Sequence, residues 1–208
     1  AEDADDIARE RFEREATLRD RLKHPGIARI IRLTRVAGRP CLIRELVPGR
    51  SLEERLEEDG SLHWPEAFSI GITIAQALAH AHAQGVIHRD VKPANIIMDK
   101  NYRQPKLIDF DLAKRMPETS QETLTRLTQT GDGIGSLSYL APEQLTQARD
   151  VGPHADIYGL GMTLYHLISG QRPFLDVDPE DFIDALTRTG PRSLHEFAGA
   201  TPAHACKV

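Results

Sequence analysis

The sequence has few cysteines and few aromatic residues, and each shortage argues against a class of protein. The two cysteines, Cys41 and Cys206, are far apart and belong to no Cys-x-x-Cys pattern, so neither a disulfide framework nor a zinc motif is predicted. Aromatic residues make up 5% of the chain, and 26 Lys and Arg against 31 Asp and Glu give a net charge of −5. Because nucleic-acid-binding domains are usually basic, no nucleic-acid partner is expected.

Long hydrophobic runs are also missing. The most apolar stretch, residues 70–83, is interrupted by one Gln and two His. A membrane-spanning helix needs about 20 consecutive apolar residues, so we expect no membrane segment, and the cysteine usage favours a cytoplasmic protein. The composition, with 40% hydrophobic and 27% charged residues over 208 positions, is ordinary for a globular chain that can bury a core.

Hydrophobic spacing and turn residues divide the chain into helices and short extended segments. Ser51 and Glu54 have the spacing at which a hydroxyl and a carboxylate satisfy the free N–H groups of a helix start, and Gly60 marks the end of that helix. Pro65 favours the first turn of a longer helix that Gly85 ends. The other expected elements are a helix over 6–23, a hairpin of 27–36 and 41–47, short apolar segments at 86–87, 96–98 and 107–108, a buried helix over 155–169, and a helix that begins at 178 and fades by 190.

Four short patterns carry the candidate chemistry. His-Arg-Asp at 88–90 is followed in the same loop by Asn95, and Asp-Phe at 109–110 comes next. Ala-Pro-Glu at 141–143 follows, and Asp-Ile-Tyr-Gly at 156–159 then opens a buried helix. In this order, the patterns resemble those of serine/threonine protein kinases of the bacterial, eukaryotic-like group.

The resemblance implies an α+β fold of the bilobal protein-kinase type. Residues 1–47 are expected to form a partial small lobe, and residues 48–208 a mostly α-helical large lobe. Kinases of this group place a glycine-rich strand turn and a strand lysine before the first long helix, and neither occurs in this sequence. We therefore expect a kinase catalytic domain that is truncated at both ends.

The resemblance also assigns catalytic roles. Asp90 would orient and deprotonate the attacking hydroxyl, Lys92 would contact the transferred phosphate, and Asn95 and Asp109 would hold a metal ion. The implied cofactors are ATP and Mg²⁺, with Mn²⁺ as the alternative ion. The implied substrates are Ser and Thr residues of proteins.

Further residues receive nucleotide-binding, regulatory and structural roles by the same resemblance. Arg89 would pair with a phosphorylated threonine, for which Thr128 and Thr130 are the candidates. His88 is expected to be a core residue, and Asp156 a buried carboxylate that accepts N–H bonds from the catalytic loop. The nucleotide-binding residues would be Glu15, Glu45, Val47, Ile97 and Asp109.

Three positions depart from the family pattern. No lysine precedes Lys23, so Glu15 lacks the lysine with which it would pair. Asp111 stands where the family has glycine after Asp-Phe, which adds a carboxylate near the metal ligands. Arg44, directly before the expected hinge at 45–47, occupies a position that is usually apolar, and we expect it to point to solvent or toward Glu15.

We therefore predict a serine/threonine protein kinase domain and expect this chain alone to be inactive. The alternative is a pseudokinase, or a nucleotide-binding interaction module without catalysis. Asp111 and the missing lysine favour that alternative, whereas the presence of Asp90, Asn95 and Asp109 together opposes it. A small-molecule phosphotransferase is disfavoured by the Ala-Pro-Glu pattern and the long polar segment before it.

Overall fold

The computed structural model describes residues 22–36, 39–100, 104–110, 135, 137–146, 151–178 and 180–197. Most of the helix expected over 6–23 lies outside these ranges, and so do Glu15, Asp111, Thr128 and Thr130. The roles of those four residues therefore stay predictions.

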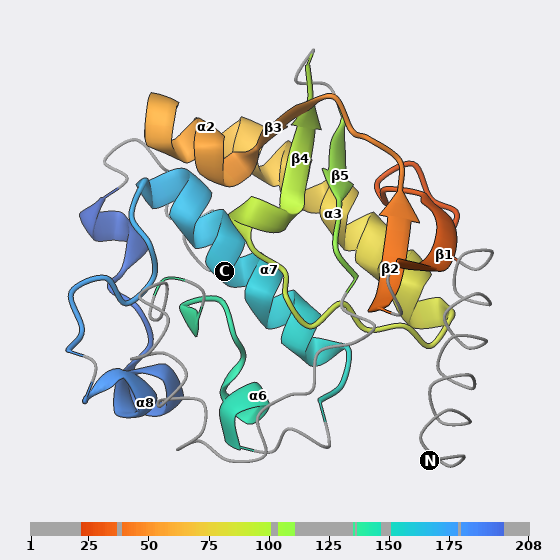
Figure 1. Ribbon diagram of the computed structural model, residues 1–208. Coiled ribbons are helices and arrows are strands. Elements are labelled where there is room, and N and C mark those ends of the chain that lie inside the picture. The colour runs from red at the N-terminus through yellow and green to blue at the C-terminus, as the bar shows by residue number, and fades with distance from the viewer. Residues whose placement is uncertain are drawn as a thin grey trace.

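The described elements form a two-stranded hairpin beside a larger body that is mostly helical (Figure 1). The hairpin consists of β1 (Ile30–Val36) and β2 (Arg39–Arg44). The larger body contains a sheet of β3 (Gly49–Ser51), β4 (Ile96–Asp99) and β5 (Pro105–Leu107), the helices α2 (Leu52–Asp59), α3 (Trp64–Ala83), α6 (Pro142–Thr146), α7 (His154–Ser169) and α8 (Phe182–Asp184), and the short turns η1 (Pro93–Asn95), η2 (Ala185–Thr189) and η3 (Leu194–Glu196). The arrangement is of the predicted α+β type.

The hairpin predicted from segments 27–36 and 41–47 is present with different bounds, because its second strand begins at Arg39 and ends at Arg44. β1 pairs antiparallel with β2, with Val36 opposite Arg39 at the turn, and the register shifts between Ile30 and Arg32. Three apolar side chains of the hairpin remain exposed, namely Ile31, Val36 and Ile43. The hairpin therefore contributes less to the core than the rest of the described chain.

The second sheet places two predicted site segments at one edge. β4 lies between β3 and β5 and is antiparallel to both. Ile96 at the start of β4 lies opposite Leu107 at the end of β5, and the Ile108 N–H donates to the Asn95 carbonyl (2.9 Å). A parallel bridge from Ile27 to Leu107 joins the segment before β1 to the same sheet. Residues on both sides of Asn95 and Ile108 are thereby held together.

Helix α2 begins and ends where the sequence predicts. The Ser51 hydroxyl accepts a hydrogen bond from the Glu54 N–H (3.1 Å), and the Glu54 carboxylate accepts one from the Ser51 N–H (2.7 Å). Gly60 follows the helix with a φ of 75°, which a residue with a Cβ adopts only under strain. Reciprocal capping of this kind stabilises a helix start by about 1 kcal/mol.

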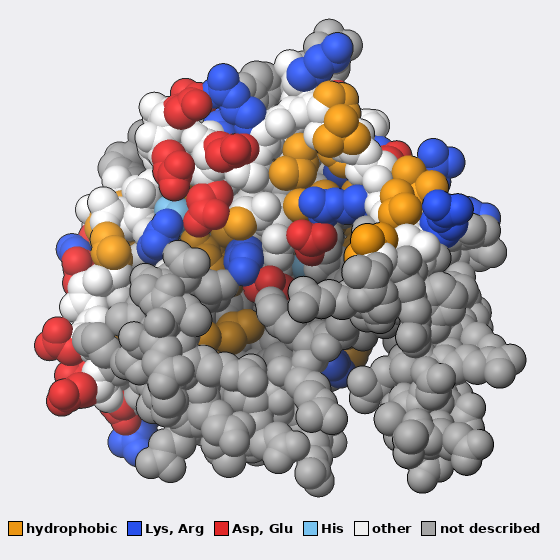
Figure 2. Space-filling view, viewed as in Figure 1, with side chains coloured by type: hydrophobic (Ala, Val, Ile, Leu, Met, Phe, Trp, Pro, Cys, Tyr) orange, Lys and Arg blue, Asp and Glu red, His pale blue; other side chains and the backbone are white. Residues whose placement is uncertain are grey.

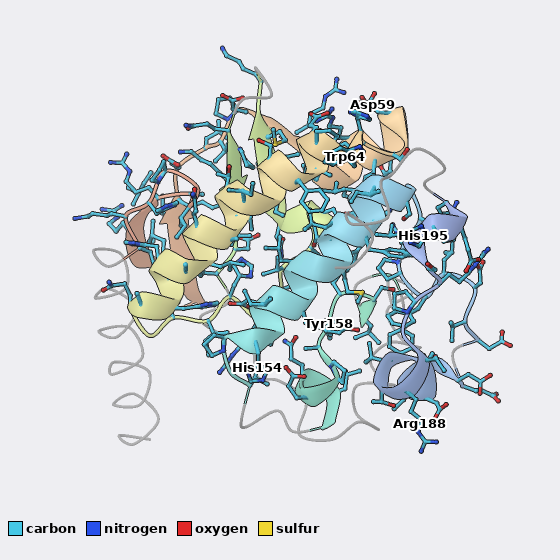
Figure 3. All side chains as sticks on the ribbon, turned by 180° about the vertical axis from the view of Figure 1, so that it is seen from behind. Asp59, Trp64, His154, Tyr158, Arg188 and His195 are labelled. Carbon is cyan, nitrogen blue, oxygen red and sulfur yellow. The ribbon has the colours of Figure 1, made fainter. Side chains whose placement is uncertain are left out.

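The two buried helices predicted from the sequence, α3 and α7, lie side by side and form the centre of the larger body (Figure 3). A Cβ atom at Gly71 of α3 would lie 2.9 Å from the Leu164 side chain of α7, so the close approach requires glycine at this position. α7 ends at Gly170, which has a left-handed φ of 69°. Within the described ranges, none of the helices is long and apolar enough to cross a membrane.

Candidate active site

The segment between α3 and β4 brings three of the predicted catalytic residues together. The Asn95 amide Nδ2 donates to the Asp90 backbone oxygen (2.8 Å) and to the Asp90 carboxylate Oδ2 (3.0 Å). The Lys92 ammonium lies 3.1 Å from the same Oδ2, and both side chains are less than one-fifth exposed. The Asp90 carboxylate is thus held in place while keeping contact with solvent.

Asp109 follows β5 and therefore lies at the same sheet edge as Asn95. Its φ is 57°, and Arg89, directly before the predicted catalytic residue Asp90, has a φ of 66°. A left-handed backbone costs a non-glycine residue of order 1–3 kcal/mol, so it persists only where the surrounding structure enforces it. Such conformations concentrate at functional sites, and two of the three in the described chain occur at Asp109 itself and directly before Asp90, while the third is at Phe174.

His88 is a core residue, as predicted. Its ring is fully buried and packs edge-on against Phe110, with 4.6 Å between ring centroids. The Asp90 N–H donates to Nδ1 (3.2 Å), so the ring proton is on Nε2, which donates to the Ile108 carbonyl (2.9 Å). Burial lowers the pKa of His88 below its ordinary value and keeps the ring neutral. The neutral ring connects the catalytic loop to the segment after β5.

Asp156 at the start of α7 is the buried carboxylate that the sequence predicts. Its oxygens accept hydrogen bonds from the backbone N–H groups of His88 (2.8 Å) and Arg89 (2.6 Å). The His82 Nε2 lies 2.7 Å from Oδ2, and Asp156 is 1% exposed. These donors offset the cost of burying the carboxylate, and they attach the catalytic loop to α7.

Gln144, which sequence reasoning missed, joins α6 to the catalytic loop. Its Oε1 accepts from the Ala141 N–H (2.9 Å), and its Nε2 donates to the Arg89 carbonyl (2.9 Å). Gln144 is 2% exposed, and a polar residue directly after Ala-Pro-Glu is the signal that could have identified it. Nearby, Glu143 pairs with His154 (3.1 Å), which Figure 3 labels at the start of α7.

A second buried polar pair fixes the end of the segment before α6. The Tyr139 hydroxyl lies 2.7 Å from Nδ1 of His166. Burial raises the pKa of Tyr139 and lowers the pKa of His166 to about 4, so the hydroxyl keeps its proton and donates it to a neutral ring. A Cβ at Gly159 would lie 2.9 Å from the Val91 carbonyl and 3.3 Å from the Tyr139 carbonyl. The catalytic loop at Val91 and the segment at Tyr139 therefore both pack against α7 at Gly159.

Apart from Asp109 after β5, the predicted nucleotide-binding residues within the described chain lie between β2 and β3 and in β4. Val47 and Ile97 are half-buried, and Glu45 pairs with the Lys106 ammonium from β5. Burial alone would raise the pKa of the Glu45 carboxyl, but hydrogen bonds from Lys106 and from the backbone of Arg29 lower it below its ordinary value. The Glu45 carboxylate is therefore ionised and engaged with β5.

Arg44 forms a contact that the sequence did not indicate. Its Nη1 donates to Oδ1 of Asp109 (2.6 Å), and its side chain is 38% exposed, whereas Glu15, the other direction expected for it, lies outside the described residues. The contact joins residues that are far apart in sequence, at the end of β2 and just after β5, and it brings a guanidinium to a predicted metal ligand. Figure 2 shows acidic and basic side chains next to each other across the middle of this face, between the hairpin and the helical body.

The oxygen donors at this edge fit a magnesium or manganese ion. The Asn95 side chain donates to Asp90 through Nδ2, so its amide oxygen Oδ1 is the atom that could hold the ion, and the Asp109 side chain is 57% exposed. No group of three or more His, Cys, Asp or Glu that could hold a metal occurs among the residues described. Mg²⁺ in phosphoryl-transfer sites is usually held by one or two protein oxygens together with substrate phosphates, so a larger cage is not required.

Comparisons with known proteins give a consistent result. The family model "Protein kinase domain" matches residues 1–196. The probable serine/threonine-protein kinase PknB of Lactococcus lactis is 37% identical over 170 residues, covering 82% of this chain and 26% of that protein. The serine/threonine-protein kinase PrkC of Bacillus subtilis is 37% identical over 164 residues, covering 79% and 24%. The chain thus spans about a quarter of the length of these curated relatives.

Solved structures show the same similarity. The crystal structure of the PknI kinase domain of Mycobacterium tuberculosis superposes with a TM-score of 0.67 at 29% identity, covering 92% of this chain and 65% of that chain. A double mutant of the same domain gives a TM-score of 0.68, covering 95% and 67%. These matches confirm the predicted bilobal α+β architecture.

Proposed function

Because this chain belongs to the protein kinase domain family, we propose that it carries the catalytic machinery for transfer of the ATP γ-phosphoryl group to Ser or Thr of proteins. The observation that supports this most directly is the cluster of Asp90, Lys92 and Asn95, with Asp109 at the same sheet edge. A domain that only bound partners would gain nothing from this combination of side chains.

In the proposed reaction, the Asp90 carboxylate orients the substrate hydroxyl and accepts its proton as the oxygen attacks the γ-phosphorus. The bond between the γ-phosphorus and the bridging oxygen breaks, and ADP leaves. Lys92, now 3.1 Å from Asp90, would pair with the transferred phosphoryl oxygens. The hydrogen bond from Asn95 keeps the Asp90 carboxylate aimed while its ammonium partner moves.

Asn95 and Asp109 would hold Mg²⁺ or Mn²⁺ through Oδ1 of the amide and the exposed carboxylate. The ion, when bound, supplies positive charge that stabilises the triphosphate and its developing negative charge. The contribution of this chain is the orientation of the two ligands, because the hydrogen bond from Ile108 to Asn95 and the left-handed backbone at Asp109 set where they lie. Glu45, Val47 and Ile97 are the proposed contacts for the rest of the nucleotide, and Glu15 remains a predicted one.

Arg89 is the proposed regulatory residue. The Arg89 Nε is buried, and no residue in the described ranges accepts a hydrogen bond from this nitrogen. A phosphate on Thr128 or Thr130 would give this guanidinium a dianionic partner and would link the segment that carries it to the catalytic loop.

We further propose that the domain acts in the cytoplasm, where ATP is abundant and Ser- and Thr-containing protein substrates are available.

The test is phosphate transfer from labelled ATP by the complete gene product that contains this chain. We expect Asp90→Ala to lower incorporation into Ser- and Thr-containing peptides by about 10²-fold or more, because the group that positions and deprotonates the hydroxyl is lost. Asp176→Ala is the matched control, since Asp176 pairs with Arg192 at an exposed position. Mass spectrometry of the unmodified protein should find phosphate on Thr128 or Thr130.

Two outcomes would contradict the proposal. Equal incorporation by the unmodified protein and Asp90→Ala would remove the assigned role of Asp90. Binding of a fluorescent ATP analogue with no ATP-dependent phosphate transfer would instead favour the nucleotide-binding module without catalysis, the function for which the guanidinium at Asp109 is the specific supporting observation.

A further inference from the structure

The contact between Arg44 and Asp109 is unusual because it places a fixed positive charge on a proposed metal ligand. The Nη1 of Arg44 lies 2.6 Å from Oδ1 of Asp109. Arg44 is the last residue of β2, and its backbone position is set by pairing with Ile30 of β1. The guanidinium therefore reaches the site from the hairpin, whereas the carboxylate comes from the sheet of the larger body.

Two other cations of the described chain near this edge pair with different carboxylates. Lys106 pairs with Glu45, and Lys92 lies beside Asp90. Among the ion pairs of the described chain, the one that involves Asp109 is that with Arg44. Asp90, Glu45 and Asp109 thus pair with three different cations among the described residues, and the cation at the proposed metal ligand is the arginine whose role the sequence could not explain.

We propose that Arg44 is a tethered counter-ion of Asp109 that a divalent metal ion must displace. A Mg²⁺ ion binds a carboxylate oxygen at about 2.0–2.1 Å, and a guanidinium at hydrogen-bond distance from the same oxygen would be repelled by the ion's double charge. Arg44 therefore lowers the affinity of the site for metal. It acts through Asp109 and is a positioning residue. This inference rests on the proposed function, because it takes Asp109 as a metal ligand.

The exposure of the pair makes this exchange possible. The Arg44 side chain is 38% exposed and the Asp109 side chain is 57% exposed. Ion pairs of this exposure contribute little to stability, so the guanidinium can leave the carboxylate at small cost and without disturbing the hairpin. A contact of this strength therefore lowers the affinity of the site for a metal ion but does not prevent binding.

The experiment is a Mn²⁺ titration of the nucleotide-free protein, followed by the electron paramagnetic resonance signal of free Mn²⁺. Arg44→Met should bind Mn²⁺ about two- to fivefold more tightly than the unmodified protein, the range that corresponds to the strength of an exposed ion pair. Arg44→Lys keeps a charge but loses the planar fork, and it should restore weaker binding. Arg50→Met is the matched control, because Arg50 pairs with Glu58 at similar exposure and should leave Mn²⁺ binding unchanged.

Unchanged or weaker Mn²⁺ binding by Arg44→Met would overturn the inference, as would tighter binding of the same size in Arg50→Met. A second variant, Asp109→Asn, tests the proposed function itself. If Asp109→Asn, with Arg44 intact, binds Mn²⁺ as the unmodified protein does, Asp109 is not a metal ligand and the site assignment itself is wrong. Asp109→Asn with weakened binding, together with tighter binding by Arg44→Met, supports both.

Discussion

The two carboxylates that organise the candidate site, Asp156 and Asp109, are held in opposite ways. Asp156 is almost completely buried and accepts hydrogen bonds from two backbone N–H groups of the catalytic loop. Asp109 is more than half exposed, and its ion-pair partner, Arg44, is also in contact with solvent. One carboxylate is part of the core, and the other lies at its edge.

This difference in burial gives the two carboxylates different roles: Asp156 holds the catalytic loop in position, and Asp109 can exchange its partner. A buried carboxylate that loses its donors leaves uncompensated polar groups inside the protein, so the loop that carries Asp90 is rigidly attached to α7. An exposed ion pair can change partners at a cost of roughly 1 kcal/mol or less. The fold therefore keeps Asp90, the proposed hydroxyl-activating residue, in place, and it leaves the proposed metal ligand Asp109 able to exchange a guanidinium for an ion.

The largest effect is expected at Asp156. Asp156→Ala removes the acceptor of the His88 and Arg89 N–H groups and should lower the free energy of unfolding by about 3–5 kcal/mol, measured by urea denaturation. Asp109→Asn is the matched change at the exposed carboxylate, because asparagine also tolerates the left-handed backbone there, and it should cost less than about 1 kcal/mol. Similar losses in the two variants would contradict the contrast between them.

A second test uses the pH dependence of the buried pair of Tyr139 and His166. Because the pKa of His166 is about 4 in the folded protein and about 6.5 in an unfolded chain, the unfolded state binds more protons between these values. The stability that depends on the neutral ring is therefore present above about pH 6.5 and is lost as the pH falls toward 4. The unfolding free energy measured at pH 7 and at pH 4.5 should differ by about 2–3 kcal/mol more in the unmodified protein than in His166→Gln.

Glutamine keeps an acceptor for the Tyr139 hydroxyl, so this variant separates titration from the loss of a hydrogen bond. If both proteins lose the same stability between the two pH values, the ring of His166 is not kept neutral by burial. That result would show that the pair of Tyr139 and His166 resembles the exposed Asp109 ion pair more than the buried Asp156 carboxylate.

The smallest effect is expected at Arg44. Arg44→Met should change the unfolding free energy by less than about 1 kcal/mol, because both partners of the ion pair are solvent-screened. Thermal unfolding of this variant beside Arg50→Met provides the measurement, since Arg50 forms an ion pair of similar exposure with Glu58. A loss comparable to that of Asp156→Ala would show that the ion pair is structural.

Local signals in the sequence were enough to predict most of the described helices. Ser51 with Glu54 marks the start of α2, and Gly170 marks the end of α7, because capping depends on residues within one turn. β3 was missed, since its strand character comes from pairing with β4 and not from its own three residues. A Cβ at Gly49 would lie 1.7 Å from the Met98 carbonyl, which explains the glycine only once the pairing is known.

The candidate site divides along the same line. Asp90, Asn95 and Asp109 could be found because they belong to short ordered patterns, and His88 and Asp156 took the structural roles that those patterns imply. The partner of Arg44 could not be predicted, because the contact crosses from the hairpin to the second sheet. For the same reason, the place of Gln144 directly after Ala-Pro-Glu could mark it as a candidate but does not indicate that its side chain reaches the Arg89 carbonyl.

Gly159 gives the surface of α7 a sharply uneven tolerance to sequence change. Two residues earlier, Ile157 is 55% exposed, and many side chains would be accommodated there. At 159, even the single methyl group of alanine would push apart the carbonyls of Val91 and Tyr139 from the helix. A saturation library across this helix, selected for folded protein, should therefore contain many residue types at position 157 and only glycine at position 159, one half-turn away.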